Sequence, residues 1–220
     1  IFAPAGDRYK QSPFLKVFVY GESGAGKTSW AARSPKPLIL SLEEQGMASI
    51  AKANPDAIVV PCYDLSVFEQ VWDAVLKGEA TDIEGQPALK VTIGKHSTTV
   101  QTIVVDSLTE LTQKYHDRQK GAQKNISIDQ WGVIKNLGNK FLKEATSIKA
   151  NVVVLARAHT STEDGRSISV PITTPKSIAD DLGGHFNMVA RAGRRHGKVG
   201  IGDDLRMNGS DGVDCHIFHI

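Results

Sequence analysis

Gly21-Glu22-Ser23-Gly24-Ala25-Gly26-Lys27-Thr28 fits the pattern G-x-x-x-x-G-K-[ST] and lies between an apolar β-type run and a helical stretch. The glycines let the backbone curl so that successive N–H groups point inward and form a nest for an anion at the start of the helix. Lys27 can then reach the β- and γ-phosphates of a nucleotide, and Thr28 can offer its hydroxyl to Mg²⁺. The alternative is a chance match in a Gly-rich turn, which the flanking strand and helix disfavour. The expected nucleotide-binding residues are Gly21, Glu22, Ser23, Gly24, Ala25, Gly26, Lys27, Thr28 and Ser29.

A downstream acidic position completes this expected phosphate site, because the apolar run 102–105 ends at Asp106. A carboxylate at the carboxyl end of a parallel strand lies beside the phosphate loop, where it can hold Mg²⁺ from a second side. We therefore expect Thr28 and Asp106 to hold the metal ion together. Asp106 could also cap the helical segment 108–115, although Ser107 could cap it equally well.

The group that orients an attacking water must come from another strand end, and Glu43 and Glu44 follow the β-type run 37–42. A carboxylate there can direct water toward the γ-phosphate. For either residue alone, a solvated acidic loop is the competing interpretation. Glu110 is a weaker candidate because it lies one turn into the expected helix.

The rest of the chain alternates short β-rich runs with longer helical patterns, which is typical of an α/β fold with a mostly parallel twisted sheet flanked by helices. At 220 residues the chain is long enough for one such domain, spanning 1–220, and short for two. We expect a β-hairpin insertion at 79–100 and an extension of short C-terminal strands and turns at 183–220. The expected core strands are 14–20, 37–42, 57–60, 102–106 and 151–156, and the expected helices are 64–78, with a capping box at Ser66 and Glu69, and 130–149.

Composition disfavours several classes of protein. The formal net charge is only +2, so any affinity for nucleic acid must come from local patches. No apolar run approaches the ~20 residues of a membrane-spanning helix, so we expect no membrane partner. Cys62 and Cys215 lie far apart, as expected for reduced thiols of a cytoplasmic protein. A zinc site at Cys215, His216 and His219 is disfavoured because it lacks a fourth ligand.

Several segments together resemble a known family. Residues 103–108 resemble the acidic strand of the RecA recombinase core, and residues 39–43 resemble the RecA strand that ends in the catalytic glutamate. In motif order, residues 14–190 look like a phage-encoded RecA-like P-loop nucleotide-binding protein of the AAA/RecA superfamily, of the single-strand annealing ATPase type. The matching segments are a proline-led strand with an acidic turn (35–44), Val-Asp-Ser-Leu-Thr-Glu-Leu (105–111), Trp131-Gly132, and a strand that ends near a His (152–159).

The resemblance implies a RecA-like P-loop NTPase core and Mg-dependent ATP hydrolysis, slow or stimulated by DNA, in which Lys27, Glu43 and Asp106 are catalytic. It further implies action on single-stranded DNA in phage recombination, annealing or replication, in the host cytoplasm. The cofactors expected from it are ATP and Mg²⁺. The expected partners are single-stranded DNA, further copies of the chain in a ring or filament, and a single-strand-binding protein.

The position that senses the γ-phosphate departs from the family pattern. RecA carries a Gln after the strand that corresponds to 152–156, whereas this chain offers Arg157 and His159. Either side chain can donate a hydrogen bond to a phosphate oxygen. For His159, a satisfied residue at a sheet edge is the competing interpretation.

Two expected loops carry the candidate DNA contacts. In the RecA-like arrangement they face the central axis of a ring or filament, and the first, 117–129, holds Arg118, Lys120 and Lys124. The second, 160–176, holds Arg166 and Lys176. Neither has an aromatic platform for base stacking, which favours contacts to the DNA backbone. Ordinary solvated loops are the alternative.

The densest cluster of basic residues in the sequence lies after both of these loops, at Arg191, Arg194, Arg195 and Lys198. RecA-like proteins insert basic residues of one subunit into the nucleotide site of its neighbour, where they neutralise charge on the γ-phosphate. The resemblance makes this cluster a candidate for that role or for DNA. A plain basic hairpin is an equal alternative.

Other classes of protein share the same phosphate loop. A P-loop kinase without DNA binding would carry an Arg-rich lid, but 79–100 offers only Lys90 and Lys95. A signalling GTPase would need an Asn-Lys-x-Asp-type guanine reader, which the sequence lacks. A nucleotide-dependent assembly switch, which binds nucleotide without turnover, remains an alternative to the ATPase.

Overall fold

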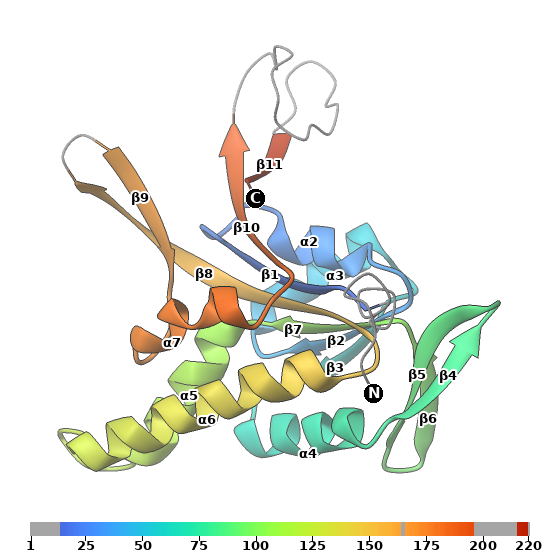
Figure 1. Cartoon of the computed structure of the whole chain (residues 1–220), viewed down its shortest axis with the longest axis horizontal. Helices are drawn as coiled ribbons and strands as arrows, with labels where there is room; N and C mark the ends of the chain where they lie inside the picture. Colours follow the sequence, from blue (N-terminus) through green and yellow to red (C-terminus); the bar gives the residue numbers. More distant parts are fainter. Residues whose placement is uncertain (1–13, 164–165, 196–214, 220) are drawn as a thin grey trace, which may run out of the picture.

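The computed structural model describes residues 14–163, 166–195 and 215–219, and its centre is a mostly parallel sheet (Figure 1). The strand order is β11-β10-β1-β8-β7-β2-β3, and β9 pairs with β8. Neighbours along this order are parallel except β10 and β11, which are antiparallel, like β8 and β9. The strands of this sheet are β1 (Lys16–Gly21), β2 (Pro37–Ser41), β3 (Ile58–Pro61), β7 (Thr102–Asp106), β8 (Asn151–Glu163), β9 (Arg166–Pro171), β10 (Met188–Arg195) and β11 (Cys215–His219).

The central strands of this sheet carry apolar side chains on both faces, and helices cover both faces. Along β1, Phe18 belongs to the core on one face, while Val17 and Val19 belong to the core on the other. Helices α2 and α3 pack on the second of these faces, and α4, α5 and α6 pack on the first (Figure 1). The α-helices are α2 (Lys27–Ala32), α3 (Met47–Ala53), α4 (Leu65–Leu76), α5 (Leu108–Lys120), α6 (Ile128–Ser147) and α7 (Ser177–Asp180). The predicted α/β class is confirmed.

Two helix starts differ in detail from the prediction. The predicted capping box of α4 is wrong, because the side chain of Asp64 caps the helix by accepting from the backbone N–H of Ser66 at 2.7 Å. Helix α6 begins two residues earlier than predicted, and its capping box is formed by Ser127 and Gln130.

The insertion after α4 is a small antiparallel sheet of three strands rather than a hairpin. Its strands are β4 (Glu79–Ile83), β5 (Gln86–Ile93) and β6 (His96–Val100), in the order β4-β5-β6. Leu89 and Val91 on β5 and Val100 on β6 are buried and join the core cluster that includes α4. This anchoring explains why the segment folds as a sheet at the side of the domain (Figure 1).

The two loops predicted to contact DNA are largely regular structure. Helix α5 continues to Lys120 and α6 starts at Ile128, so a short connection replaces the loop expected at 117–129. The second expected loop is mostly a hairpin, because β8 runs on to Glu163 and pairs with β9. In the part of the chain that the structure describes, no helix has the length and apolar character needed to cross a membrane.

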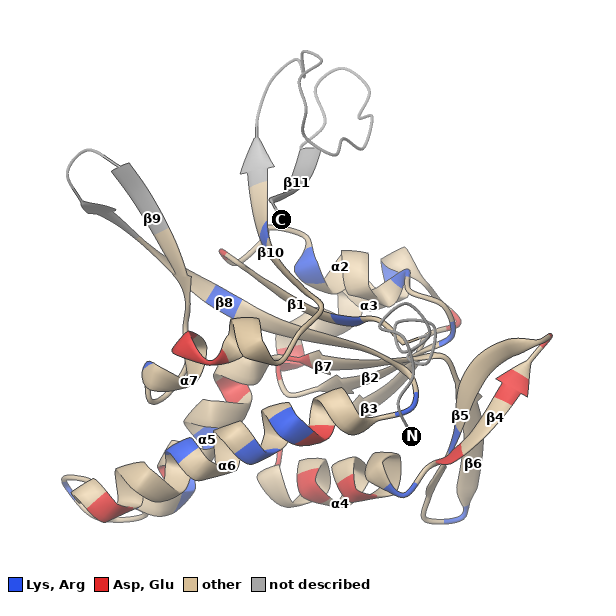
Figure 2. Ribbon diagram, viewed as in Figure 1, with Lys and Arg blue, Asp and Glu red and all other residues tan. Residues whose placement is uncertain are grey.

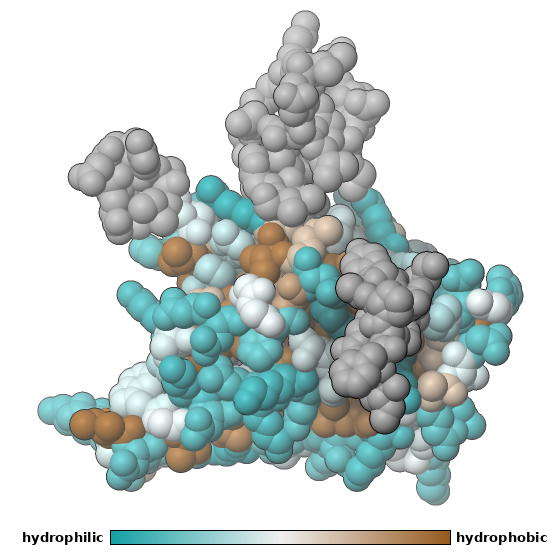
Figure 3. Space-filling model, in the orientation of Figure 1, coloured by the Kyte–Doolittle hydropathy of each residue, from teal (hydrophilic) through white to brown (hydrophobic). Residues whose placement is uncertain are grey.

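The surface seen in Figure 3 is mostly hydrophilic. Small apolar patches interrupt it, one of them at the free end of the α5–α6 pair. Ile128, at the start of α6, is 89% exposed, which makes it the most exposed large apolar side chain among the described residues.

Candidate functional site

The phosphate loop connects β1 to α2 at the carboxyl edge of the sheet. Gly24 and Gly26 have φ values of 78° and 81°, in the left-handed region that favours glycine, and they produce the curl of the loop. Gly21 is required for a different reason: a Cβ there would lie 2.3 Å from the carbonyl oxygen of Ala192 on β10. The loop therefore depends on β10, a contact that the motif alone does not reveal.

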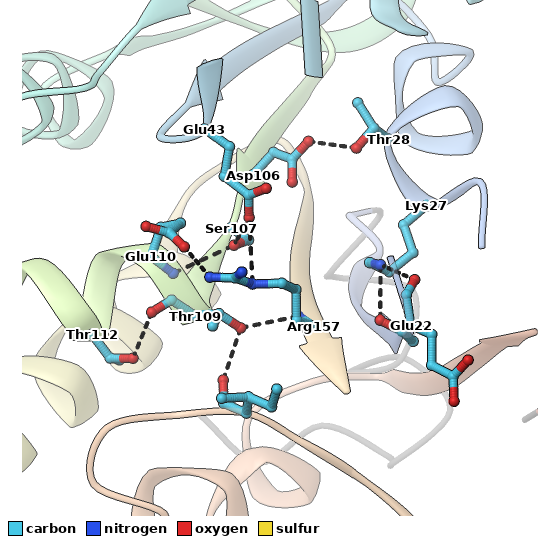
Figure 4. Close-up of polar contacts among 12 residues, drawn as sticks. Glu22, Lys27, Thr28, Glu43, Asp106, Ser107, Thr109, Glu110, Thr112 and Arg157 are labelled. Carbon is cyan, nitrogen blue, oxygen red and sulfur yellow. Dashed lines mark hydrogen bonds and ion pairs between the residues drawn. The ribbon is translucent and has the colours of Figure 1, made fainter. Parts of the chain in front are cut away.

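Lys27 lies beneath this loop with its ammonium group turned toward it. Its Nζ donates to the carbonyl oxygens of Gly21 and Glu22, each at 2.9 Å (Figure 4). Burial lowers the pKa of Lys27, and the negative charges of Asp106 and Glu43 act in the opposite direction. A buried cation placed under the loop can pair with phosphate oxygens that the loop cradles.

Thr28 and Asp106 lie side by side, as the motif and the strand end predicted. The hydroxyl of Thr28 donates to Oδ2 of Asp106 at 2.7 Å (Figure 4). Asp106 is buried, and desolvation raises the pKa of its carboxyl, while the hydrogen bond from Thr28 lowers it. The side chain of Ser107, rather than that of Asp106, caps α5 by accepting from the N–H of Glu110.

These residues fit a magnesium–nucleotide complex. A hydroxyl and a carboxylate are hard oxygen donors of the kind that Mg²⁺ prefers, and here they are hydrogen-bonded to each other where the phosphate loop enters α2. The left-handed glycines leave no Cβ at two positions of the loop, so its backbone can approach phosphate oxygens closely. Thr28 and Asp106 would hold the metal, and Lys27 would hold the phosphates.

Glu43 and Glu44 follow the same strand but have different surroundings. Oε1 of Glu43 accepts from the hydroxyl of Ser107 at 2.7 Å, which brings its carboxylate beside Asp106 (Figure 4). Glu44 is exposed and begins the 3₁₀ turn Glu44–Gly46. Of the two candidates, Glu43 is the one whose carboxylate contacts a residue directly after β7, namely Ser107.

Arg157 joins this group from β8, at the last position where this strand pairs with β1. Its guanidinium forms an ion pair with Glu110, and its Nε lies 4.0 Å from Oε1 of Glu43. Its backbone N–H donates to Oγ1 of Thr109 at 2.9 Å. His159, the second sensor candidate, is exposed two residues further along the strand. From the sequence, Glu110 was a weak candidate for a site residue and Thr109 was not a candidate. The three-residue spacing of Ser107 and Glu110 places both side chains on one side of the first helical turn, and this spacing could have pointed to Glu110.

Arg191 lies beside the phosphate loop of its own chain. It lines a pocket of about 130 Å³ with residues of the loop and of β10, and it pairs in register with Tyr20 of β1. The other pocket-lining residues are Glu22, Ser23, Ala25, Ala192 and Gly193. Arg194 and Arg195 continue β10, but their side chains and Lys198 lie outside the described residues, as do the side chains of Cys215, His216 and His219.

The three DNA candidates do not share one free loop. Arg118 lies in α5, where its guanidinium is 2.7 Å from Oε1 of Glu69 and lies over the ring of Tyr115. Lys120 is the last residue of α5, and Lys124 is exposed in the connection to α6. Of the second set, Lys176 is exposed before α7, and the side chain of Arg166 lies outside the described residues. In Figure 2 the basic positions are spread over several elements.

Comparisons with known proteins found a matching family and similar solved structures. The family model described as the AAA domain matches residues 14–209, whereas no curated protein matches the sequence. A crystal structure of the RadB recombinase matches at 18% identity with a TM-score of 0.43, covering 82% of this chain and 75% of that one. A prototypical ATPase from the type III secretion system of pathogenic bacteria matches at 10% identity with a TM-score of 0.45, covering 80% of this chain; the chain spans about half, 51%, of that protein's length. With its phosphate loop and parallel sheet inside a family match over most of its length, the chain belongs to the AAA domain family.

Proposed function

We propose that the protein binds ATP with Mg²⁺ at the phosphate loop and hydrolyses it. The observation that carries this proposal is the contact between Thr28 and Asp106, with Lys27 beneath the phosphate loop and Glu43 hydrogen-bonded to Ser107, the residue after Asp106. A hydroxyl, a carboxylate, a buried ammonium group and a second carboxylate are the groups that phosphoryl transfer to water requires.

Each of these residues has a distinct task in the proposed reaction. Lys27 exchanges its contacts with the loop carbonyls for contacts with phosphate oxygens. Thr28 and Asp106 would hold the metal ion, which would supply positive charge to the phosphates. Glu43 orients the water and accepts its proton, and Arg157 provides positive charge for the γ-phosphate.

We further propose that the protein acts on single-stranded DNA as a homo-oligomer, in phage recombination, annealing or replication, alongside a single-strand-binding protein. The resemblance to RecA-like annealing ATPases supports this, together with Lys120 and Lys124 at the α5–α6 end. Arg191, Arg194 and Arg195 are kept as candidates for action on a neighbouring subunit's nucleotide, although Arg191 also lines a pocket at its own loop.

A nucleotide-dependent assembly switch is the second candidate. Glu43 accepts a hydrogen bond from Ser107 and has the guanidinium of Arg157 4.0 Å away, so its carboxylate is already engaged by the protein. This arrangement favours slow turnover in the isolated subunit.

One experiment separates these possibilities: steady-state ATP turnover measured with and without single-stranded DNA, with Lys27→Ala as the matched inactive protein. We expect turnover that exceeds the variant's and rises when DNA is added. Turnover equal to that of Lys27→Ala, combined with tight ATP binding, would favour the switch.

A further inference from the structure

Arg157 lies between two carboxylates that come from different parts of the chain. One of its terminal nitrogens, Nη2, pairs with Glu110 on the first turn of α5. Its Nε lies on the other side, 4.0 Å from Oε1 of Glu43 (Figure 4). Glu110 therefore holds the guanidinium at one end, and Glu43 is the next acceptor within reach.

The Nε of Arg157 is the unusual atom in this group. It is buried and has no hydrogen-bond partner among the described residues. At 4.0 Å it is too far from Glu43 for a hydrogen bond, whereas charge-assisted bonds of this type are about 2.8 Å long. A buried donor without a partner costs free energy, so this position needs a reason.

The backbone of Arg157 is fixed, which leaves its side chain as the part that can move. Its N–H donates to Thr109 Oγ1 at 2.9 Å, and the Thr109 hydroxyl in turn donates to the carbonyl of Ile172 at 2.8 Å. The N–H of Ile172 donates to the carbonyl of Arg157 at 2.8 Å. These bonds join α5 to the base of the β8–β9 hairpin and set the point from which the guanidinium extends.

We propose that Glu110 is a positioning residue of the nucleotide site, which acts by holding Arg157 away from Glu43; this inference rests on the proposed function. With Glu110 in place, the carboxylate of Glu43 keeps lone pairs for water, and Nε of Arg157 stays free for a phosphate oxygen. Without the charge of Glu110, the guanidinium closes on Glu43 and forms a direct charge-assisted hydrogen bond. Both groups are then lost to the nucleotide.

The test is a double-mutant cycle on ATP turnover with Glu110→Gln, Arg157→Gln and the combined variant. Glu110→Gln is expected to lower kcat by about tenfold or more with little change in KM. In the Arg157→Gln background the same change is expected to have no further effect, because the cation that closes on Glu43 is gone. Glu110→Asp keeps the charge and should retain more turnover than Glu110→Gln.

Equilibrium binding gives a readout that does not depend on hydrolysis. A fluorescent nucleotide, displaced by ADP or by a non-hydrolysable ATP analogue, reports how strongly the site prefers the triphosphate. Glu110→Gln should reduce this preference by about tenfold in the parent protein and leave it unchanged in the Arg157→Gln background. Asp73→Asn is the matched control, because Asp73 pairs with Lys77 on the exposed side of α4; its turnover and preference should equal those of the parent.

The outcomes distinguish this inference from the proposed function. If the parent binds and hydrolyses ATP but Glu110→Gln behaves like the parent, the positioning role is wrong and the ATPase stands. Equal losses in both backgrounds also overturn the positioning role, since Glu110 would then act on the fold and not through Arg157. If the parent and Lys27→Ala bind nucleotide equally weakly, the proposed function itself fails.

Discussion

Lys27 is a buried cation whose hydrogen-bond acceptors belong to the phosphate loop itself. Replacing it by Ala removes the point charge that would pair with the β- and γ-phosphates, so Lys27→Ala should weaken ATP binding by about 100-fold or more. Titration with a fluorescent ATP analogue measures this. Lys52→Ala, on the exposed side of α3, is the control and should bind like the parent. Unchanged binding by a folded Lys27→Ala protein would remove the phosphate-site assignment.

Glu43 and Glu44 are neighbours in sequence and serve as each other's control. Glu43→Gln keeps the size of the side chain and its contact with Ser107 but removes the charge that accepts the proton. ATP should still bind, while kcat falls by about 10²-fold or more. Glu44 is exposed, and Glu44→Gln should keep most of the activity. Single-turnover hydrolysis checks the ranking, and a reversed result would make Glu44 the base.

The residues of the site differ in how far the sequence could predict them. Thr28 and Asp106 could be paired in advance, because a phosphate-loop motif and a strand that ends on a carboxylate meet at one sheet edge. The pair of Arg157 and Glu110 could not, since no motif links them and they meet through the parallel packing of β7 beside β8. The approach of β10 to Gly21 was equally invisible, because it depends on a backbone contact from the far end of the chain.

At the scale of elements, Lys16 ties the start of β1 to the segment that leaves α6. Its Nζ donates to the carbonyls of Ile148 and Ala150 at 2.5 and 2.8 Å. Burial lowers the pKa of Lys16 to about 8 from its usual 10.5. Between these values Lys16 is protonated more fully in the unfolded chain than in the folded one. Its contribution to the free energy of unfolding therefore increases as pH rises from about 8 to 10.

The Lys16 prediction is checked by comparing the parent with Lys16→Met in urea unfolding at several pH values. The parent should gain up to about 2 kcal/mol relative to the variant between pH 8 and 10, because only the parent carries the shifted group. The other lysines and the tyrosines are present in both proteins, so their contributions to the pH dependence of the free energy of unfolding cancel in the comparison. A difference that stays constant or shrinks with pH would mean that Lys16 has an ordinary pKa in the folded state.

The elements that the sequence predicted well are those with strong apolar patterns. The long helices and most core strands were predicted nearly at their observed bounds, because the strands are continuous apolar runs and the buried residues of the helices recur at the helical period. The exception is β8, which was expected to end at residue 156 and continues to Glu163. The hairpin β8–β9 was not predicted, since its outer part is a mostly polar run whose strands are paired along the backbone. For the same reason β6, with its polar start at residues 96–99, was assigned to a hairpin and not to a third strand.

At the scale of the whole molecule, the net charge of +2 leaves any DNA binding to a few positions. Arg118, Lys120 and Lys124 were predicted to contact DNA from one loop, but Arg118 lies in α5 and is paired with Glu69, and the two lysines are nearer the free end of the helical pair. We now expect Lys120→Ala with Lys124→Ala to weaken single-stranded DNA binding for all sequences alike. Each lost phosphate contact reduces the log–log salt slope by about 0.7, so the pair should reduce it by about 1.4.

Glu69 supplies the opposite test of the same surface. Glu69→Gln removes the carboxylate that holds Arg118, and the guanidinium then becomes available to a DNA phosphate. Binding should tighten and the salt slope should steepen by about 0.7, while ATP binding stays the same because α4 contributes no residue to the phosphate site. Titrations at several salt concentrations measure both effects. If the lysine pair and Glu69→Gln both leave the slope unchanged, the α5–α6 end is an ordinary solvated surface, and the search for DNA contacts moves to Arg191, Arg194 and Arg195 on β10.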